Sequence, residues 1–562
     1  METILQLIEK RLENGSAQTS FTYLKDGEKD ETQISLGELR ADALNLGCVL
    51  KPDEPVLIIL PQGLTFISAL FGCLYSAAVA VPVGVPAKIG RSLAVDKIIT
   101  ETRSRTIITD RDSHEKIKRF PGIERFEDLN VLFMEDFTGS APGLSELKLP
   151  DIRQPAFLQY TSGSTGKPKA VIVTHENIAA NSQFILDRSG NTSASTSVSW
   201  LPCFHDMGLI EGIFQPVFGN FQSVIMSPVH FIQRPVRWLK AISKYRAATS
   251  GSPNFGFDYC TERIKDEELE GIDLGSLRCL YNGAEPIRPQ TLRNFAKRFE
   301  KIGFSEEKIV SCYGLAEATL AVTISGVGET PKVLKVDADA LKDKRVRLST
   351  GENTVELVSC GKPAPDTHLK IVSEVSLTEM PQDRIGEIVV SGKTVADGYF
   401  GSEQNSSEAF FRSGDLCSLR TGDLGFIHKG ELYVTGRIKD LIIIRGKNHY
   451  PQDLEYTAAN SDTSLSANSC AAFSIIERSA EKLIILQEIK RSFLKNVDLS
   501  AAAGMIRKAV SRDHGILPDR VVLLRPGTLP KTTSGKIRRK ECRRLFEENS
   551  FDPLADVTGI RR

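Results

Sequence analysis

Short apolar runs rich in β-branched residues recur along this chain, and longer stretches with helical spacing separate them. Strands that alternate with helices build mostly parallel sheets that those helices cover, so the pattern predicts an α/β fold. No repeat of fixed period occurs, which excludes the solenoid classes. We expect strands at residues 106–109, 170–173, 223–226, 277–281 and 386–390.

One long stretch, residues 55–87, contains no charged side chain and is long enough to cross a lipid bilayer. A Pro-Gln-Gly turn and a helical stretch at 64–78 separate two apolar runs, at 56–60 and 79–83. We therefore predict a strand, a helix and a strand, and no transmembrane segment. The first thirty residues carry several charges and lack the apolar core of a secretory signal, so a cytoplasmic location is expected.

The pattern changes near residue 438. An apolar run at 432–435 is followed by Gly-Arg-Ile-Lys-Asp, and the chain then begins a new, smaller α/β pattern. We predict a large N-terminal domain, residues 1–438, with mixed or parallel sheets flanked by helices, and a small mobile C-terminal α+β lid domain, residues 439–562. In the lid we expect strands at 471–475, 482–488 and 521–524 and a helix at 500–512.

The charge of the chain is balanced, with 71 Lys and Arg against 71 Asp and Glu. This balance gives no electrostatic reason to expect nucleic acid or a membrane surface as a partner. The ten cysteines are scattered, without a CxxC pair or the Cys/His spacing of a zinc site. They are expected to be reduced thiols in the core of an intracellular enzyme.

The most informative local feature is the segment 160–169, YTSGSTGKPK, which follows an expected strand at 156–159. Its glycines let backbone amides approach an anion, its hydroxyls can donate hydrogen bonds and its lysines supply positive charge, so it predicts a phosphate-binding loop. It is not the Walker P-loop, because only two residues separate Gly163 from Gly166. A Ser/Gly-rich segment alone is more often a solvated loop.

Five further motifs follow this loop along the chain. They are Asn282-Gly283-Ala284-Glu285-Pro286, Tyr313-Gly314-Leu315-Ala316-Glu317-Ala318-Thr319, Thr421-Gly422-Asp423, Gly436-Arg437-Ile438-Lys439-Asp440 and Pro530-Lys531-Thr532-Thr533-Ser534-Gly535-Lys536. The set and its order resemble the adenylate-forming superfamily, which includes acyl-CoA synthetases, luciferases and the adenylation domains of peptide synthetases. The resemblance spans about residues 35–544. It implies ATP-dependent activation of a carboxylic acid as its acyl adenylate.

The resemblance assigns ATP and Mg²⁺ to these motifs. Glu317 and Thr165 would hold Mg²⁺ beside the phosphates, because carboxylate and hydroxyl oxygens are the hard ligands that this ion prefers. Asp423 would accept hydrogen bonds from the ribose, and Arg437 would contact ribose or phosphate. The other implied nucleotide-binding residues are Thr161, Ser162, Gly163, Ser164, Gly166, Lys167, Gly283, Ala284, Glu285, Pro286, Tyr313, Gly314, Leu315, Ala316 and Lys536. For an isolated Asp or Glu in such turns, a cap or a surface charge is the ordinary alternative.

Two lysines gain roles from the same resemblance. Lys536 follows a Ser/Thr/Gly segment and is expected to open a basic helical stretch, residues 536–540. In the family this lysine contacts the attacking carboxylate and the α-phosphate, where its charge offsets the charge that grows in the transition state. Lys439 matches the hinge about which the small domain rotates. The predicted catalytic residues are Lys536, Thr165, Glu317 and His205.

The segment 199–209, SWLPCFHDMGL, resembles the substrate gate of fatty acyl-AMP ligases and long-chain acyl-CoA synthetases. A medium- or long-chain fatty acid fits, because each buried methylene contributes about 0.8 kcal/mol to binding. Small residues such as Gly208, Gly212, Gly251 and Gly283 could open a tunnel for the chain. A lone His beside aromatic residues is as often structural. The predicted substrate residues are His205, Asp206, Met207, Gly208, Gly283 and Ala316.

Residues 331–357 form an unusually long polar segment that is dense in charge. One interpretation is a tolerated surface insertion. The other is that this chain resembles fatty acyl-AMP ligases, whose insertion here is held to hinder the lid rotation that builds a CoA-thioester site. That reading favours transfer of the acyl group to the phosphopantetheine of an acyl carrier protein, or of a carrier domain of a polyketide or peptide synthase. A fatty acyl-CoA synthetase is the nearest alternative. An amino-acid adenylation domain and a non-catalytic nucleotide-binding regulator are more distant ones.

Overall fold

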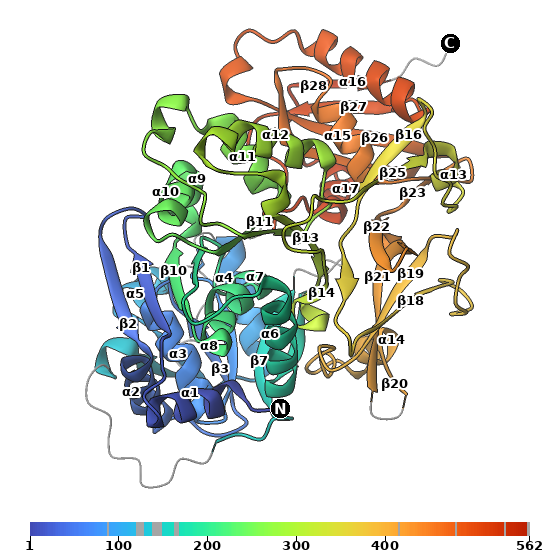
Figure 1. Cartoon of the computed structure of the whole chain (residues 1–562). Helices are drawn as coiled ribbons and strands as arrows, with labels where there is room; N and C mark the ends of the chain where they lie inside the picture. Colours follow the sequence, from blue (N-terminus) through green and yellow to red (C-terminus); the bar gives the residue numbers. More distant parts are fainter. Residues whose placement is uncertain are drawn as a thin grey trace.

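The computed structural model describes residues 1–86, 89–119, 129–137, 149–161, 168–413, 416–477, 480–532 and 535–558. Helices alternate with strands through a large N-terminal part, and a smaller C-terminal part follows. In Figure 1 the smaller part lies at the top, in orange and red, above the remainder, whose colours run from blue to orange. The predicted α/β fold with a large first part and a small last part is confirmed.

The first sheet has the strand order β6-β5-β3-β4-β7-β8, and all its pairs are parallel except β7 with β8. The strands are β3 (Pro55–Ile59), β4 (Val79–Val83), β5 (Thr106–Thr109), β6 (Asn130–Phe133), β7 (Pro155–Thr161) and β8 (Lys169–Thr174). Helix α3 (Leu64–Tyr75) joins β3 to β4, which confirms the interpretation of the charge-free stretch. Its side chains from Phe66 onward are buried in the core. Within the described residues, no helix has both the length and the apolar character to cross a membrane.

The second sheet has the order β17-β14-β13-β12-β11-β9-β10-β1-β2. Strands β9 to β13 pair in parallel, so their carboxyl ends open at one edge, where ligands bind in sheets of this kind. The strands are β1 (Ser20–Leu24), β2 (Glu31–Ser35), β9 (Thr196–Ser199), β10 (Gln222–Met226), β11 (Thr249–Pro253), β12 (Cys279–Gly283), β13 (Ile309–Gly314), β14 (Ala321–Ile324) and β17 (Lys362–Pro363). The main helices of this region are α1 (Ile4–Glu13), α2 (Leu36–Gly47), α6 (His175–Ser189), α7 (Asp206–Leu209), α8 (Gln215–Gly219), α10 (Val236–Lys244), α11 (Asn254–Arg263) and α12 (Pro289–Phe299).

A third, antiparallel sheet completes the large part. It contains β18 (His368–Val372), β19 (Gly386–Ser391), β20 (Phe410–Ser413), β21 (Leu416–His428) and β22 (Glu431–Arg437). The polar segment 331–357 precedes this sheet and is itself folded, as β15 (Val333–Asp337), α13 (Ala338–Lys342) and β16 (Thr354–Val358). Val336 and Leu341 are buried against Phe426 of β21, so the segment has an apolar inner face beneath its charged surface.

The C-terminal part is built on the sheet β25-β26-β27-β28. Its elements are β23 (Ile442–Ile444), β24 (Lys447–His449), α15 (Pro451–Ala459), β25 (Leu465–Glu477), β26 (Ala480–Ile489), α16 (Leu499–His514), β27 (Arg520–Leu524), α17 (Arg539–Glu547) and β28 (Ala555–Thr558). The three strands and the helix expected here are confirmed. The helix expected from Lys536 is wrong in its start: Ile537 pairs with Lys531 in a β-bridge, and the Arg538 amide donates to the Pro530 carbonyl. These contacts hold residues 536–538 extended, and α17 begins at Arg539.

Candidate active site

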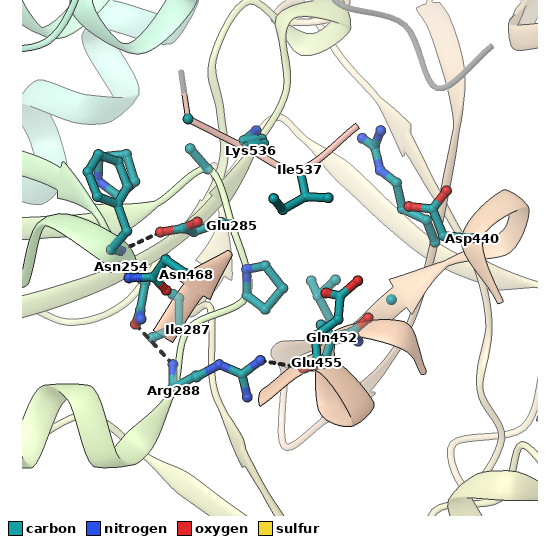
Figure 2. A pocket seen from close by; sticks show the side chains of 18 of the residues that line it. Asn254, Glu285, Ile287, Arg288, Asp440, Gln452, Glu455, Asn468, Lys536 and Ile537 are labelled. Atoms are coloured by element: carbon teal, nitrogen blue, oxygen red, sulfur yellow. Dashed lines mark hydrogen bonds between the residues drawn. The ribbon is translucent and has the colours of Figure 1, made fainter. Parts of the chain in front are cut away.

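A cavity of about 3390 Å³ lies between the large part of the chain and the C-terminal part, and residues of both line it. Figure 2 shows a portion of it, with Glu285 on one wall and Lys536 reaching in from the other. The structure thus brings together motifs that are hundreds of residues apart. The predicted site residues along its walls are Thr161, His205, Asp206, Met207, Gly208, Ala284, Glu285, Pro286, Tyr313, Gly314, Leu315, Ala316, Glu317, Asp423, Arg437, Lys439 and Lys536.

Lys536 is held by a tight turn of the C-terminal part. Its backbone amide donates to Thr532 Oγ1 at 3.0 Å, and the Thr532 amide donates to the Lys536 carbonyl at 2.8 Å. Lys536 is exposed to water and lines the cavity. Desolvation lowers the pKa of Lys536, while the carboxylate of Asp206 opposes the shift. The lysine is therefore a cation that interacts with carboxylates of the large part of the chain.

Asp423 of β21 is the centre of a polar cluster, in which Asp423 and Tyr313 are buried and Arg437 is half-exposed. The Tyr313 hydroxyl donates to Asp423 Oδ2 at 2.8 Å, and Arg437 Nε donates to Oδ1 at 2.6 Å. Pairing with the Asp423 charge raises the pKa of Arg437 above its usual range. A carboxylate has about four acceptor positions, so Asp423 can still accept from a ribose. Strands β21 and β22 set this geometry, because Asp423 and Arg437 are register partners.

Glu317 lines the cavity near Lys169. The Tyr399 hydroxyl donates to its Oε1 at 2.8 Å, and Lys169 Nζ lies 4.4 Å from the centre of the Tyr399 ring. One oxygen of Glu317 is thus fixed while the carboxylate keeps acceptor capacity toward the cavity. Mg²⁺ is commonly bound by one or two carboxylates together with substrate phosphates, so this residue fits such a site.

The expected phosphate loop lies between β7 and β8. Thr161 and Lys169 are register partners at the ends of these strands, and both line the cavity. The intervening predicted residues, Ser162, Gly163, Ser164, Thr165, Gly166 and Lys167, lie outside the described residues. Desolvation lowers the pKa of Lys169, and the nearby charge of Lys439 adds to the effect. The anchors of the loop therefore face the cavity beside Glu317.

The Ala284–Glu285–Pro286 wall begins where β12 ends. Ala284 takes a left-handed backbone conformation, with φ of 66°, which turns the chain toward the cavity. The Phe255 amide donates to Glu285 Oε1. Burial raises the pKa of Glu285, and the charges of Lys536 and Arg288 oppose this. Gly283 itself is not on the cavity wall, because Cys312 lies over it.

Two sets of contacts hold the C-terminal part in this position. Arg288 Nη2 donates to the Gln452 carbonyl at 2.7 Å, and its guanidinium lies 4.1 Å from the centre of the Tyr456 ring (Figure 2). On the other side, Asn448 Nδ2 donates to the Lys342 carbonyl at 2.7 Å. Arg288 belongs to the region of the second sheet, whereas Lys342 belongs to the 331–357 segment.

The segment around Lys439, the expected hinge, is a short turn of 3₁₀-helix (Ile438–Asp440) after β22. Lys439 is exposed, while its neighbour Asp440 is paired with Arg539 at 3.0 Å. Arg539 also pairs with Glu455 at 2.7 Å, within the C-terminal part. These ion pairs fix the residue after Lys439 to the C-terminal part, so Lys439 lies at the border between the two parts.

Comparison with known families agrees with this site. Residues 9–400 match the model of the AMP-binding enzyme family. The chain belongs to the AMP-binding enzyme family. Residues 439–554 match a second model, described as the AMP domain of Disco-interacting protein 2-like proteins. The resemblance to the adenylate-forming superfamily is confirmed.

This AMP-binding enzyme is similar to relatives along nearly its whole length. It is 38% identical to the medium-chain-fatty-acid–[acyl-carrier-protein] ligase JamA of Moorena producens (strain JHB), over 98% of this chain and 96% of the relative. It is 33% identical to the putative fatty-acid–CoA ligase FadD21 of Mycobacterium tuberculosis (strain ATCC 25618 / H37Rv), over 98% and 99%. A crystal structure of a fatty acyl-adenylate ligase from Legionella pneumophila, in complex with acyl adenylate and pyrophosphate, superposes with a TM-score of 0.74 at 36% identity, covering 99% and 98%.

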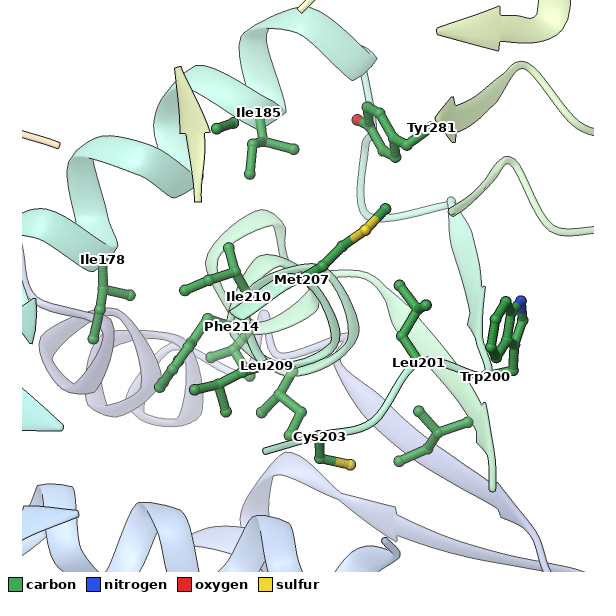
Figure 3. Packing of buried hydrophobic residues seen from close by; sticks show 14 of the residues in the cluster. Ile178, Ile185, Trp200, Leu201, Cys203, Met207, Leu209, Ile210, Phe214 and Tyr281 are labelled. Carbon is green, nitrogen blue, oxygen red and sulfur yellow. The ribbon is translucent and has the colours of Figure 1, made fainter. Parts of the chain in front are cut away.

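The region expected to receive the acyl chain lies beside α7. Figure 3 shows Ile185, Met207 and Tyr281 pointing toward one another from α6, α7 and β12, and all three line the cavity. His205 precedes α7, and its ring lies 4.9 Å from that of Phe204. This end of the cavity of the AMP-binding enzyme is therefore largely apolar.

The glycines expected to open a tunnel have a different role. A Cβ atom on Gly208 would lie 2.2 Å from the Pro202 carbonyl oxygen, and one on Gly283 would lie 2.6 Å from Cys312 Sγ. The space beside Gly251 is taken by the carboxyl group of Glu211. At these positions, glycine allows other protein atoms to pack closely against the backbone. The expectation that they widen a tunnel is wrong for Gly251 and Gly283, because neighbouring side chains fill the space.

Several residues of the site were not found from the sequence. Tyr399, which orients Glu317, lies 82 residues away and in no motif. Arg288 follows the Ala284–Pro286 motif but carries no recognisable pattern. Glu211 did give a signal, because it is the one charged residue in the mainly apolar run 207–218. A charge inside such a run indicates either a buried functional group or a solvent-facing position.

Proposed function

We propose that this AMP-binding enzyme is a fatty acyl-AMP ligase. It activates a medium- or long-chain fatty acid with ATP, giving the acyl adenylate and pyrophosphate, and passes the acyl group to the phosphopantetheine of an acyl carrier protein. One observation carries the proposal: a single cavity joins a polar end, with Asp423 and Lys536, to an apolar end walled by Ile185 and Met207. The similarity to JamA, a carrier-protein ligase, and to the Legionella acyl-adenylate ligase supports the same reaction.

In the first step, an oxygen of the fatty acid carboxylate attacks the α-phosphorus of ATP. A new P–O bond forms, the bond from the α-phosphorus to the bridging oxygen breaks, and pyrophosphate leaves, so the product is a mixed anhydride. Lys536 stands at the wall where the two anions must meet, and its ammonium offsets their repulsion and the charge that grows in the transition state. No protein side chain becomes covalently bonded.

The other residues bind and orient the nucleotide. Tyr313 offers a flat aromatic surface for adenine, and Asp423 accepts from the ribose hydroxyls. Glu317, together with Thr165, would hold Mg²⁺, which neutralises phosphate charge when bound. His205, Asp206 and the other gate residues would guide the carboxylate toward Lys536.

The second step requires access for the thiol of the acceptor. We propose that residues 1–438 and 439–562 move as two domains about Lys439, and that the enzyme acts in the cytoplasm. The 331–357 segment contacts the C-terminal part through Lys342 and Asn448 and packs against Tyr450. Each contact must break before the C-terminal part can turn, which favours a large carrier-protein acceptor over free CoA and supports the ligase over the fatty acyl-CoA synthetase.

Adenylation is tested by ATP–pyrophosphate exchange with a series of saturated fatty acids. We expect exchange that depends on the fatty acid and on Mg²⁺, with medium or long chains preferred. Exchange that responds to amino acids and not to fatty acids would replace the proposal with an amino-acid adenylation domain. Binding of ATP without any exchange would indicate a non-catalytic regulator.

The acceptor is tested in a second assay, with labelled fatty acid, ATP, Mg²⁺ and either CoA or a holo-acyl carrier protein. We expect acyl-AMP in both reactions, and thioester on the carrier protein only. Rapid formation of acyl-CoA would assign the chain to the fatty acyl-CoA synthetases. A variant without residues 338–353, with β15 joined to β16 by a short Gly-Ser turn, is the informative comparison. Acyl-CoA formation by this variant alone would assign the restraint to the inserted segment.

A further inference from the structure

A buried carboxyl group stands at the apolar end of the cavity. Glu211 is 5% exposed and lines the cavity, yet neither of its oxygens has a hydrogen-bond partner among the residues that the structure describes. It lies in a π-helical turn (Ile210–Phe214) between α7 and α8. Such turns are rare and occur often at functional sites.

The position of Glu211 is built by its neighbours. A Cβ atom on residue 251 would lie 2.4 Å from Glu211 Oε2, so a side chain at 251 would displace the carboxyl group from this position. Gly251 is the register partner of Tyr281 in the parallel pair β11–β12, so Tyr281 projects from the same face of the sheet. The Tyr281 hydroxyl is also buried and makes no hydrogen bond of normal geometry to a described residue, although Ser189 and Cys279 lie beside it. Two polar groups therefore face an otherwise apolar space.

These groups lie at a distance from the reacting atoms. Ala284 lies at the polar end of the cavity, where the nucleotide is proposed to bind. Tyr281 precedes it by three residues, and three residues of a strand span roughly 10 Å. That separation corresponds to several carbons of an extended acyl chain. Glu211 is thus too deep to contact the carboxylate or the phosphates, and the adenylation mechanism does not use it.

An unbranched alkyl chain would be a poor occupant of this position. Covering a polar group without giving it a partner costs about 1–3 kcal/mol. Burial raises the pKa of Glu211 to about 8, so at neutral pH the group is mainly an uncharged carboxyl that can both donate and accept. A hydroxyl on the ligand has the same double capacity. An ammonium would lose its hydration beside a single carboxyl group, which is a larger cost.

We propose that Glu211, with Tyr281 beside it, determines specificity by hydrogen bonding to a hydroxyl group carried several carbons from the carboxylate of the fatty acid. The inference rests on the proposed function, because it concerns the acyl chain of the same reaction. It adds a substrate class: hydroxylated fatty acids, selected over the unsubstituted acids of equal length.

The test measures kcat/KM for ATP–pyrophosphate exchange with decanoic acid and with its monohydroxylated isomers, from the second carbon to the last. For the natural sequence we expect one mid-chain isomer to exceed decanoic acid by about tenfold or more, because one lost hydrogen bond at a built site has at least this effect. Glu211→Leu should abolish or reverse that preference. Glu211→Gln, which still donates and accepts, should retain most of it, and Tyr281→Phe should reduce it in part.

Controls separate specificity from folding. Glu270→Gln, at an exposed position in the large part, should leave the preference unchanged. Thermal unfolding and exchange with decanoic acid report whether Glu211→Leu is folded, and Glu211→Gln provides the nearly isosteric alternative.

Three outcomes would overturn the inference. They are an equal or better rate with decanoic acid than with every hydroxylated isomer, the same preference in Glu211→Leu as in the natural sequence, or a preference for an amino-substituted acid. If decanoic acid and the other fatty acids are adenylated but no hydroxyl preference appears, the proposed function stands and this inference fails. If no fatty acid of any kind supports exchange, both fail together.

Discussion

The two ends of the cavity are constructed in opposite ways. At the polar end, which is the proposed nucleotide site, two carboxylates are paired: Asp423 accepts from Tyr313 and Arg437, and Glu317 accepts from Tyr399. At the acyl end, the walls are apolar side chains such as Ile185 and Met207, and the carboxyl group of Glu211 has no partner among the described residues. At one end, protein groups already orient these carboxylates, whereas the other end leaves a polar group to be satisfied.

This difference has a physical basis. Charges that stabilise a transition state must be oriented in advance, because reorganising them during the reaction costs free energy. An acyl chain is held mainly by burial of apolar surface, which needs shape but little orientation. We therefore expect substitutions at the nucleotide end to change catalysis for all acids alike, and substitutions at the acyl end to change which acid is used.

The largest effect is expected from Lys536→Ala. In the proposed mechanism Lys536 supplies the charge that bridges carboxylate and α-phosphate, so its loss should reduce the rate of acyl-AMP formation by about a hundredfold or more. Single-turnover formation of acyl-AMP measures the rate, and calorimetric titration with ATP measures binding, which should survive. Lys531→Ala is the matched control, because that lysine is bonded to Asn468 and Ser469 within the C-terminal part. An unchanged rate in Lys536→Ala would remove this residue from the mechanism.

A smaller effect, confined to long acids, is expected from Met207→Trp. The larger ring should occupy the space between Ile185 and Tyr281 and exclude the distal methylenes, each worth about 0.8 kcal/mol. Excluding two of them should lower kcat/KM for a long-chain acid by roughly tenfold, with the KM for ATP unchanged. The ratio of rates for short and long acids is the measurement. If all chain lengths lose activity equally, the acyl chain does not pass Met207.

Glu211→Gln should reveal the unpaired carboxyl group through the pH dependence of stability. Burial raises the pKa of Glu211 to about 8 in the folded state, from the usual value of 4.5. The unfolded chain therefore loses its proton first, so the wild-type stability that comes from the neutral carboxyl is present below pH 4.5 and is lost as pH rises toward 8. In the variant, the glutamine side chain at position 211 is uncharged at every pH. Relative to the wild type, the free energy of unfolding of the variant should rise by about 1 kcal/mol for each pH unit between pH 5 and 8, as proton linkage requires. Urea titration at each pH measures it.

Two results would contradict that expectation. A difference between Glu211→Gln and wild type that does not vary with pH would show that Glu211 is not protonated in the folded state. A difference that falls as pH rises would show a charged partner for the carboxylate. Glu270→Gln, at an exposed position, should show no such trend.

The nucleotide end could largely be predicted from the sequence, and the acyl end could not. Thr161, Tyr313, Asp423 and Lys536 lie in short motifs whose residue types state their chemistry, and the cavity brings them together. Tyr399 could not be predicted from the sequence, because its role arises only from a contact with Glu317, 82 residues away. Apolar walls carry no motif, since any hydrophobic residue of suitable size can form them.

The fold shows the same division. The strand–helix–strand reading of residues 55–87 is confirmed, because a turn and two β-branched runs determine it locally. The helix expected to begin at Lys536 begins at Arg539, because the β-bridge between Lys531 and Ile537 outweighs the helical propensity of the basic residues. The sequence suggests open space beside Gly251, although the side chain of Glu211, distant in sequence, fills it. Local sequence patterns predict helices and strands, whereas the role of a small residue depends on tertiary packing.

The smallest effect is expected where the C-terminal part, which carries Lys536, rests on the large part. Arg288 contacts both the Gln452 carbonyl and the Tyr456 ring. A cation–π contact at a partly exposed site contributes about 0.5–1 kcal/mol, so Arg288→Ala should lower the rate of acyl-AMP formation by roughly two- to fivefold. Since the variant loosens the lid and leaves both ends of the cavity intact, the KM for ATP and the chain-length preference should not change. Arg263→Ala removes a similar cation–π contact, to Tyr259, within the large part alone and should leave the rate unaltered. A shift in chain-length preference in Arg288→Ala would mean that the lid position shapes the acyl end as well, and the two ends would then no longer be independent.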